Sequence, residues 1–442
     1  MNPTRARHLA LIAALIATLA ATLAAPASAQ APATGPQGQP TPRQERPDDR
    51  TPSGRAGEDY DPIGIPLGGF RLFPLLELQE IYNDNIFASS VATGQVASFV
   101  QIVKPSLELK SDWNNHMLNL FARGGFGFYT AAPTENFQDF QVGAEGRIDI
   151  QRNWNIYGGL SFNRLHEERG QPNTVQGGTE ITKYNQVTGN LGYFQKFNRL
   201  SGRLEARVDD FNYLDNGLGL GFGVIPNSER NRTEFREALR IAYEYLDGFE
   251  VWTRLGANQR RYKISVDSAG FTRHSSGWDV VVGASFDFGG ITFLEAFAGY
   301  VRQSYEDFRF RPLEAILFGV TGYWNPHRDL WVRPFVRRTI DETAYVGESG
   351  FLNTAFGVEA TYNLLPNVKL EGLASYAIAD YRAATAFNSR YDEYVTFKAG
   401  VLYTPMREFF VGPQYQYVHR SSNQPNLDYG QNILMLRLGA RL

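Results

Sequence analysis

Hydrophobic and polar residues alternate along most of the chain, most clearly over residues 431–442. One face of this segment carries Leu434, Leu436, Leu438, Ala440 and Leu442, and the other carries Met435, Arg437, Gly439 and Arg441. A period of two predicts a β-strand rather than a helix. An apolar face opposite two arginines suits a strand between lipid and water, because arginines in a soluble core would need buried partners.

The same pattern recurs through residues 69–442, in segments that carry charged side chains on one face only. Such strands are typical of a transmembrane β-barrel whose polar faces line the interior. We therefore predict an all-β, antiparallel up-and-down barrel in the outer membrane of a Gram-negative cell. The residues predicted to line its pore are Arg123, Glu145, Arg147, Asp149, Arg203, Glu205, Arg207, Glu234, Arg236, Arg240, Glu244, Arg254, Arg333, Arg337, Glu359, Arg437 and Arg441.

The predicted connections alternate between short and long. Short, turn-like connections fall at residues 112–115, 152–155, 197–199, 247–248, 289–290, 325–329, 366–367 and 405–407. Longer ones, rich in Gly, Asn, Ser and Pro, fall at residues 83–96, 131–138, 167–182, 215–230, 265–275, 307–312, 344–351, 383–389 and 421–430. These connections join about eighteen strands, and an even number puts both ends of the barrel on the short-turn, periplasmic side. A propeller or soluble sandwich would not alternate so strictly.

Four of the six tryptophans support this orientation. Trp113, Trp154, Trp324 and Trp331 lie in or beside predicted short turns. Tryptophan favours the boundary between apolar and wet regions, so these residues predict an aromatic girdle at the periplasmic end of the barrel.

The first 29 residues have the composition of an export signal. A basic start is followed by an apolar stretch over residues 9–23 and by Ala27-Ser28-Ala29, an A-x-A cleavage site. A retained anchor is the alternative, but the apolar stretch is short for a membrane helix. Residues 30–68 are rich in Pro, Gly, Gln and charge. We expect them to form a disordered periplasmic tail, either a spacer or a docking segment for a periplasmic partner.

Composition narrows the alternatives further. The chain has no cysteine, which excludes a disulfide framework and a lipoprotein anchor. No later segment approaches 18 consecutive apolar residues, so no transmembrane helix is expected. The net charge of −3 gives no basic excess for nucleic acid.

The predicted lumen is too wide for side chains alone to fill, so we expect an aqueous channel unless loops plug it. Its wall carries both signs of charge. Two interpretations stay open: facing ladders that filter solutes by size and charge, or mutual pairing along a wet wall. The aromatic residues Phe121, Tyr157, Trp252 and Phe335 are weak candidates to stack on sugar rings. The glycine-rich, apolar residues 215–226 are a candidate constriction loop, with a flexible surface loop as the alternative.

Catalytic and metal-binding patterns are weak. Arg273-His274-Ser275-Ser276 resembles the dyads of outer-membrane lipid hydrolases, with only Asp279 nearby as an acid. The segment Asn83-Asp84-Asn85 is a candidate for Ca²⁺, although a polar loop start explains it better. There is no H-E-x-x-H and no EF-hand spacing, so we expect no enzyme, no cofactor and no metal.

Three local motifs carry a family resemblance. They are Gln79-Glu80-Ile81-Tyr82-Asn83-Asp84-Asn85-Ile86-Phe87, Ser111-Asp112-Trp113, and the end of a glycine-rich strand at Phe126-Gly127-Phe128-Tyr129. With them, residues 69–442 resemble an outer-membrane β-barrel porin family found in proteobacterial exopolysaccharide gene clusters. The resemblance implies an integral outer-membrane barrel that serves as the exit pore for a secreted polysaccharide, and it brings no catalytic residues.

Three function classes remain on this basis. The leading expectation is an exopolysaccharide exit pore with a periplasmic export partner. The alternative is a general or substrate-selective diffusion porin for small hydrophilic solutes. An outer-membrane enzyme or adhesin ranks third.

Overall fold

A computed structural model describes residues 60–174, 178–217, 223–341, 343, 348–383 and 390–442. The predicted signal peptide, and residues 30–59 of the predicted tail, lie outside the described residues. Within the described part of the chain, no helix is long and apolar enough to cross a membrane.

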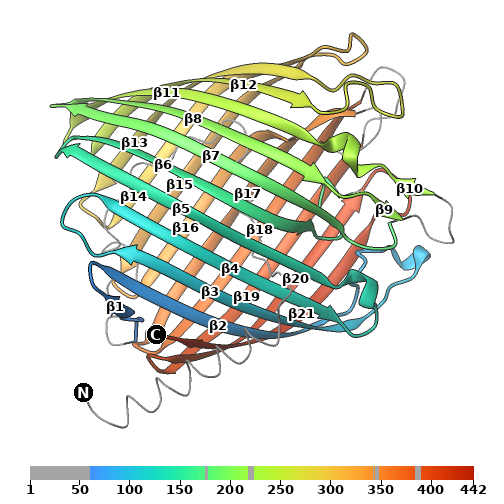
Figure 1. Ribbon diagram of the computed structural model, residues 1–442, viewed down its shortest axis with the longest axis horizontal. Helices are drawn as coiled ribbons and strands as arrows, with labels where there is room; N and C mark the ends of the chain where they lie inside the picture. The colour runs from blue at the N-terminus through green and yellow to red at the C-terminus, as the bar shows by residue number, and fades with distance from the viewer. Residues whose placement is uncertain (1–59, 175–177, 218–222, 342, 344–347, 384–389) are drawn as a thin grey trace.

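The described residues form a closed antiparallel β-barrel (Figure 1). Its sheet has 19 strands, of which β1 (Ile65–Leu67) pairs only with β2, so eighteen strands close the barrel as predicted. These are β2 (Phe70–Asn83), β3 (Ser98–Ser111), β4 (Met117–Tyr129), β5 (Phe137–Gln151), β6 (Trp154–Glu167), β7 (Thr182–Phe197), β8 (Leu200–Tyr213), β11 (Arg232–Leu246), β12 (Phe249–Tyr262), β13 (Ser275–Phe288), β14 (Thr292–Tyr305), β15 (Leu313–His327), β16 (Leu330–Asp341), β17 (Glu348–Leu365), β18 (Val368–Ala383), β19 (Tyr391–Met406), β20 (Phe409–Ser422) and β21 (Tyr429–Arg441).

The first and last barrel strands close the ring. β21 pairs with β2 from Leu75↔Arg441 to Asn83↔Ile433, and the Leu442 amide donates to the Pro74 carbonyl at 3.2 Å. The apolar terminal residue therefore lies in the seam, in phase with the strand before it. β1 lies within the range predicted as tail, so ordered structure begins before residue 69.

The connections alternate in length as predicted, with turns at one end of the barrel and long loops at the other. The described parts of the loops hold three 3₁₀ turns, η2 (Val91–Thr93), η3 (Pro133–Glu135) and η5 (Asn227–Arg230), and a small hairpin of β9 (Asn216–Gly217) and β10 (Val224–Ile225). The C-terminal strand ends at the short-turn end, where the Arg441 amide donates to Glu408 O in the β19–β20 turn (Figure 1). Both ends of the barrel thus share the side predicted to be periplasmic.

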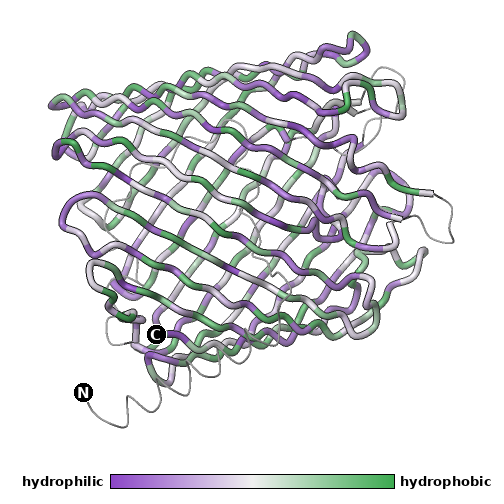
Figure 2. The backbone as a smooth tube through the Cα atoms, in the orientation of Figure 1, coloured by the Kyte–Doolittle hydropathy of each residue, from purple (hydrophilic) through white to green (hydrophobic). Residues whose placement is uncertain are grey.

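Side chains alternate between the outer and inner faces of the wall, which gives the striped backbone of Figure 2. Leu160, Leu191 and Ile316 are among the outward residues, each more than 60 % exposed. On the opposite face, Arg203 is 6 % and Asp209 0 % exposed. A bare apolar outer surface around a polar interior is stable only when lipid covers the outside.

The predicted tryptophans lie beside the short turns. Trp113 contacts Phe70 with ring centroids 5.2 Å apart, and Trp331 contacts Tyr323 at 6.0 Å. These pairs mark the short-turn rim of the apolar band, where amphipathic rings suit the lipid headgroup region.

Candidate functional site

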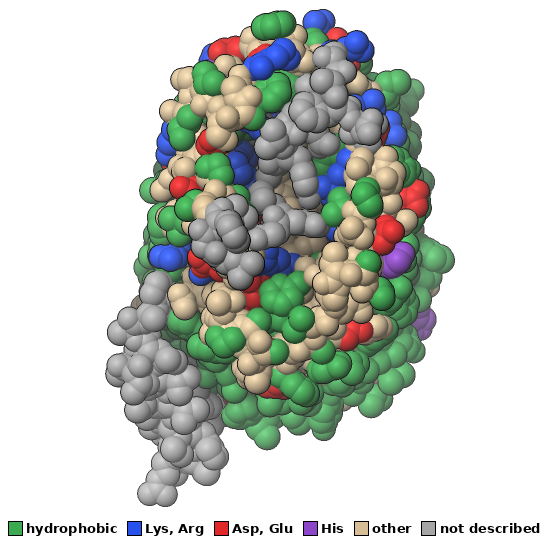
Figure 3. Space-filling view, turned by 90° about the vertical axis from the view of Figure 1, so that its right-hand side faces the viewer, with side chains coloured by type: hydrophobic (Ala, Val, Ile, Leu, Met, Phe, Trp, Pro, Cys, Tyr) green, Lys and Arg blue, Asp and Glu red, His purple; other side chains and the backbone are tan. Residues whose placement is uncertain are grey.

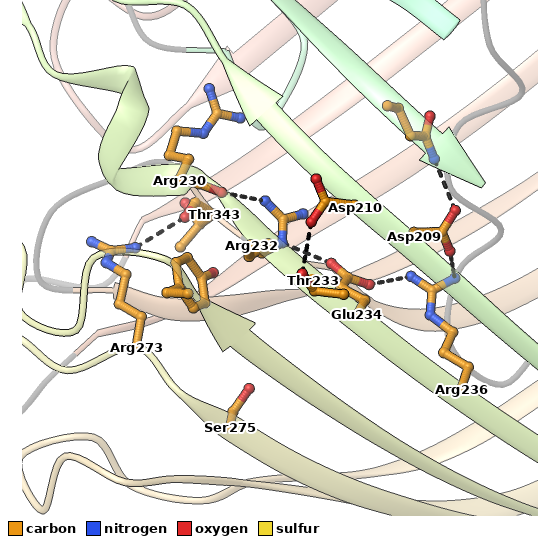
Figure 4. Close-up of polar contacts among 12 residues, drawn as sticks. Asp209, Asp210, Arg230, Arg232, Thr233, Glu234, Arg236, Arg273, Ser275 and Thr343 are labelled. Carbon is orange, nitrogen blue, oxygen red and sulfur yellow. Dashed lines mark hydrogen bonds and ion pairs between the residues drawn. The ribbon is translucent and has the colours of Figure 1, made fainter. Parts of the chain in front are cut away.

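The most strongly paired part of the inner wall spans β8 and β11 (Figure 4). Asp209 accepts from Arg207 at 2.7 Å and lies 3.9 Å from Arg236. Glu234 accepts from Arg232 at 2.7 Å and also pairs with Arg236. Positive and negative charges therefore alternate along both strands, and each buried carboxylate contacts at least one guanidinium.

A second group lies where β11, β12 and β14 pass one another. Arg240 is 2.8 Å from Glu250 and 3.7 Å from Glu295, and its guanidinium stacks 4.7 Å over the ring of Trp252. Beneath it, the inward side of β11–β17 is filled by an apolar cluster that includes Val281, Val301 and Leu317. Side chains thus occupy the lumen along this part of the wall.

Other predicted pore-lining residues are also paired. The contacts are Arg123–Glu108 at 2.6 Å, Arg147–Asp149 at 2.9 Å, Arg254–Asp279 at 3.4 Å, Glu244–Lys196 at 2.6 Å, Arg437–Glu77 at 2.9 Å, Arg333–Glu359, and the Tyr157 hydroxyl donating to Glu205. Arg203 lies over the ring of Phe194. Among the described residues, Glu145 and Arg337 have no ion pair. Arg441 differs, since it donates to the Tyr60 carbonyl at the short-turn rim. Interleaved pairing favours the wet-wall interpretation over facing ladders of opposite sign.

The interior aromatic residues that were candidates for sugar stacking already have partners in the wall, either a guanidinium group or a hydrogen bond. Arg123 lies 4.8 Å over Phe121, and Arg333 lies 6.0 Å over Phe335. Phe121 and Trp252 are buried. These rings are therefore less available to a solute than the sequence suggested.

One long loop crosses the lumen. The described first part of the β6–β7 loop leaves the wall beside β5 and reaches strands far around the ring: the Tyr381 hydroxyl of β18 donates to Pro172 O at 2.6 Å. In the strand order, seven strands separate β6 from β18 one way and nine the other way, so the two lie on opposite sides of the barrel. We call residues 168–174 the crossing segment.

Buried side chains hold the crossing segment from two sides of the barrel. Near β5, Arg169 makes two hydrogen bonds to Glu135, at 2.9 and 2.7 Å. On the far wall, the Gly170 carbonyl accepts from Tyr429 at 3.2 Å and from Arg420 at 3.4 Å. Because the far anchors are almost fully buried, the segment is fixed against the wall rather than free in solvent.

Gly170 has no room for a side chain. Its φ is +83°, which favours glycine, and a Cβ there would lie 2.5 Å from the Tyr429 hydroxyl and 2.7 Å from the Ala88 Cβ. No other residue fits this position without moving the segment. This role could not be predicted from the sequence, since a lone glycine in a long loop has many ordinary explanations.

Between the crossing segment and the wall of β2, β3 and β19–β21 lies a cavity of about 530 Å³. Lys104, Lys398, Gln414 and Gln416 are among its lining residues, none of which was predicted as a site residue. Figure 3 shows the loop end of the barrel as a hollow flanked by charged side chains of both signs.

Ion pairs also fix the loop end of the barrel. Arg230 in η5 is 2.5 Å from Glu167, and its guanidinium stacks 4.0 Å from the Tyr213 ring. Burial opposes its charge, but the Glu167 carboxylate overcomes this and raises the pKa of Arg230. Arg273 in the β12–β13 loop donates to Thr343 O at 3.2 Å, joining two loops (Figure 4).

Residues 215–226, the predicted constriction, do not form the crossing segment. Their described part forms the β9–β10 hairpin at the loop end (Figure 1), and residues 218–222 lie outside the described residues. Asn216 donates to Glu180 O at 3.0 Å, so the hairpin packs against the end of the β6–β7 loop.

The candidate dyad is not assembled. The pair was His274 and Ser276: His274 Nδ1 accepts from the Tyr262 amide at 3.1 Å, whereas Ser276 is exposed on the outer face of β13. In the Asn83-Asp84-Asn85 segment, Asn83 accepts from the Asn85 amide at 2.9 Å and Asp84 contacts β21. Across the described ranges, no group of three or more His, Asp or Glu residues is placed to hold a metal ion.

A match to a known protein family agrees with the barrel architecture. Residues 58–442 match the family model described as "Putative beta-barrel porin 2". No sequence with a curated description matches the chain. Solved structures of similar shape include OpdO of Pseudomonas aeruginosa (16% identity, 84% of this chain and 97% of that chain, TM-score 0.45), OccK9 (OpdG) of the same organism (13%, 84% and 98%, 0.47) and a BenF-like porin of Pseudomonas fluorescens Pf-5 (10%, 85% and 100%, 0.45).

Proposed function

Since the chain belongs to this family of β-barrel porins and is an outer-membrane channel, we propose that it passes small hydrophilic solutes by diffusion. The crossing segment carries this proposal. It bridges the loop end of the barrel, with Arg169 bonded to Glu135 in the β4–β5 loop and Pro172 bonded to Tyr381 on β18. A bridged mouth admits small solutes but obstructs a bulky polymer.

The exopolysaccharide exit pore, with its periplasmic partner, fits this lumen less well. A polymer would need the crossing segment to leave the far wall, breaking the hydrogen bonds to Tyr381, Tyr429 and Arg420 together. Each is worth about 0.5–1.5 kcal/mol, more where a charged group donates. Small solutes require no such displacement.

The predicted pore-lining residues enter this proposal as a wet, paired wall. Because arginines and carboxylates alternate on β8 and β11, their fields largely cancel within one strand spacing. Weak ion selectivity follows. A reversal potential near zero in a salt gradient agrees with this view, whereas a strongly cation- or anion-selective pore contradicts it.

Liposome swelling tests the function directly. Liposomes containing the purified full-length protein are diluted into sugars of increasing size, and the swelling rates are compared with those of protein-free liposomes. We expect the rate to fall steeply from mono- to tetrasaccharide and to vanish for a polymeric dextran. Swelling that is independent of the protein, or dextran entry as fast as monosaccharide entry, would overturn the proposal.

A further inference from the structure

We propose that the cavity beside the crossing segment is a binding site for an uncharged, hydroxyl-rich solute of mono- to disaccharide size. The inference rests on the proposed function and names the solute class. The volume of about 530 Å³ lies within the range of small-ligand pockets.

Five carboxamide side chains lie among the polar groups of this cavity, together with charged side chains of both signs. Asn83, Gln79, Gln414, Gln416 and Gln431 all line it. A carboxamide both donates and accepts, as does a hydroxyl, so a cluster of them matches the rim of a sugar. The side chains of Gln79 and Gln431 already donate, to Glu77 and to Asn85 O, whereas those of Gln414 and Gln416 have no hydrogen bond with any described residue.

Two carboxylates in the cavity already have side-chain partners. Glu77 accepts two hydrogen bonds from Arg437, at 2.9 and 3.1 Å, and Asp139 pairs with His166 at 2.5 Å.

Arg169, on the crossing segment, is likewise paired with Glu135. The other charged side chains in the lining are Lys104, Lys398 and Glu168, which carry both signs. No single sign of solute charge is favoured, and this selects for an uncharged solute.

An apolar surface completes the site. Ile81, Ile102, Ile433 and Met435 line the wall between the polar groups. The C–H face of a pyranose ring can pack on such a surface while its hydroxyls reach the carboxamides. This combination of a few convergent polar groups on an apolar wall is typical of small-molecule sites.

Current block in planar bilayers tests the site with maltose as the probe. Maltose should reduce the single-channel current in a saturable way. The double substitution Gln414→Met and Gln416→Met should weaken maltose binding, because two modest hydrogen bonds are lost. The maltose concentration that gives half-maximal block should therefore rise about tenfold. The control is Gln259→Met, the same change at an exposed lipid-facing position, which should leave block unchanged. Folding is checked by circular dichroism, and the single variants are measured if the double variant misfolds.

The outcomes separate the two proposals. A conducting channel with no maltose block, or equal block in the double variant and wild type, overturns the site but not the porin. Gluconate binding more tightly than maltose overturns the uncharged-solute assignment and points to Lys104 and Lys398. If the protein does not conduct, the porin proposal fails, and maltose calorimetry in detergent still decides whether the site exists.

Discussion

The Asp84 carboxylate accepts two hydrogen bonds from Asn432, one from its backbone amide at 2.7 Å and one from its side chain at 2.6 Å. The two residues are 348 positions apart. Beside them, Asn85 donates to the Gly430 carbonyl, and Gln431 donates back to the Asn85 carbonyl. The polar start of the first long loop, conspicuous in the sequence, is therefore the clasp of the barrel seam.

Removing the clasp should weaken closure. Asp84→Ala loses two hydrogen bonds to a charged acceptor, so we expect the free energy of unfolding to fall by about 2 kcal/mol. Urea titration of the protein in detergent, followed by heat-modifiable gel mobility, measures this. Asp247→Ala removes an exposed carboxylate at the β11–β12 turn and should change stability far less. Equal losses in the two variants would show that the clasp has no special role.

Gly170→Ala should displace the crossing segment, because the added Cβ meets the Tyr429 hydroxyl and Ala88. We expect a larger and noisier single-channel conductance. Gly94→Ala is a matched control, with φ +89° but no atom within 4 Å of the new Cβ. Both substitutions carry the strain of a left-handed backbone, about 1–2 kcal/mol. Only the first should alter conductance, and an unchanged pore in Gly170→Ala would argue against a constriction.

Tyr381→Phe removes only the hydroxyl that donates to Pro172 O. At about 1 kcal/mol for the lost hydrogen bond, detachment of the segment should become roughly fivefold more frequent, seen as more open-channel flicker. The control is Tyr376→Phe, at an outward residue of the same strand whose ring lies 5.1 Å from that of Phe356. Identical noise spectra for both variants would contradict the anchoring role.

Arg240→Ala should be strongly destabilising, since it leaves Glu250 and Glu295 buried without this guanidinium. Breaking a buried ion pair costs about 3–5 kcal/mol. By contrast, Arg302→Ala breaks the exposed lipid-side pair with Glu314 and should cost less than about 1 kcal/mol. Denaturant titrations of the two variants in the same detergent measure the two losses in the free energy of unfolding. Similar losses would show that burial does not determine how much an ion pair contributes.

The absence of native cysteine allows an orientation test. Arg311→Cys in the β14–β15 loop should react with a membrane-impermeant maleimide in intact cells, and Asp247→Cys at a short turn should react only after lysis. Both positions are exposed, so access to the reagent decides the outcome. The reverse labelling pattern would show that the barrel has the opposite orientation in the membrane.

The barrel could be predicted from the sequence because the alternation within each strand distinguishes its lipid-facing side from its lumen-facing side. Alternation at Leu434, Leu436 and Leu438 needs no knowledge of neighbouring strands, and turn residues mark where each strand ends. Strand number, loop alternation and seam were all accessible in this way.

The crossing segment was not accessible, because its contacts exist only after the ring closes. Gly170 meets Tyr429, 259 positions away, and Pro172 meets Tyr381, 209 positions away. The constriction hypothesis instead chose residues 215–226 for their composition. Composition indicates that a segment is a loop, but the positions of the strands in the closed barrel determine which wall the loop can contact.

The distant anchors of the crossing segment also constrain the order of folding. Tyr381, Arg420 and Tyr429 belong to the last strands of the ring, so the segment can dock only once these strands are in place. Contacts of such large sequence separation form slowly. A folding intermediate in which the segment has not yet docked would be a wide, open pore. Selective permeability would then be the last property that the molecule acquires.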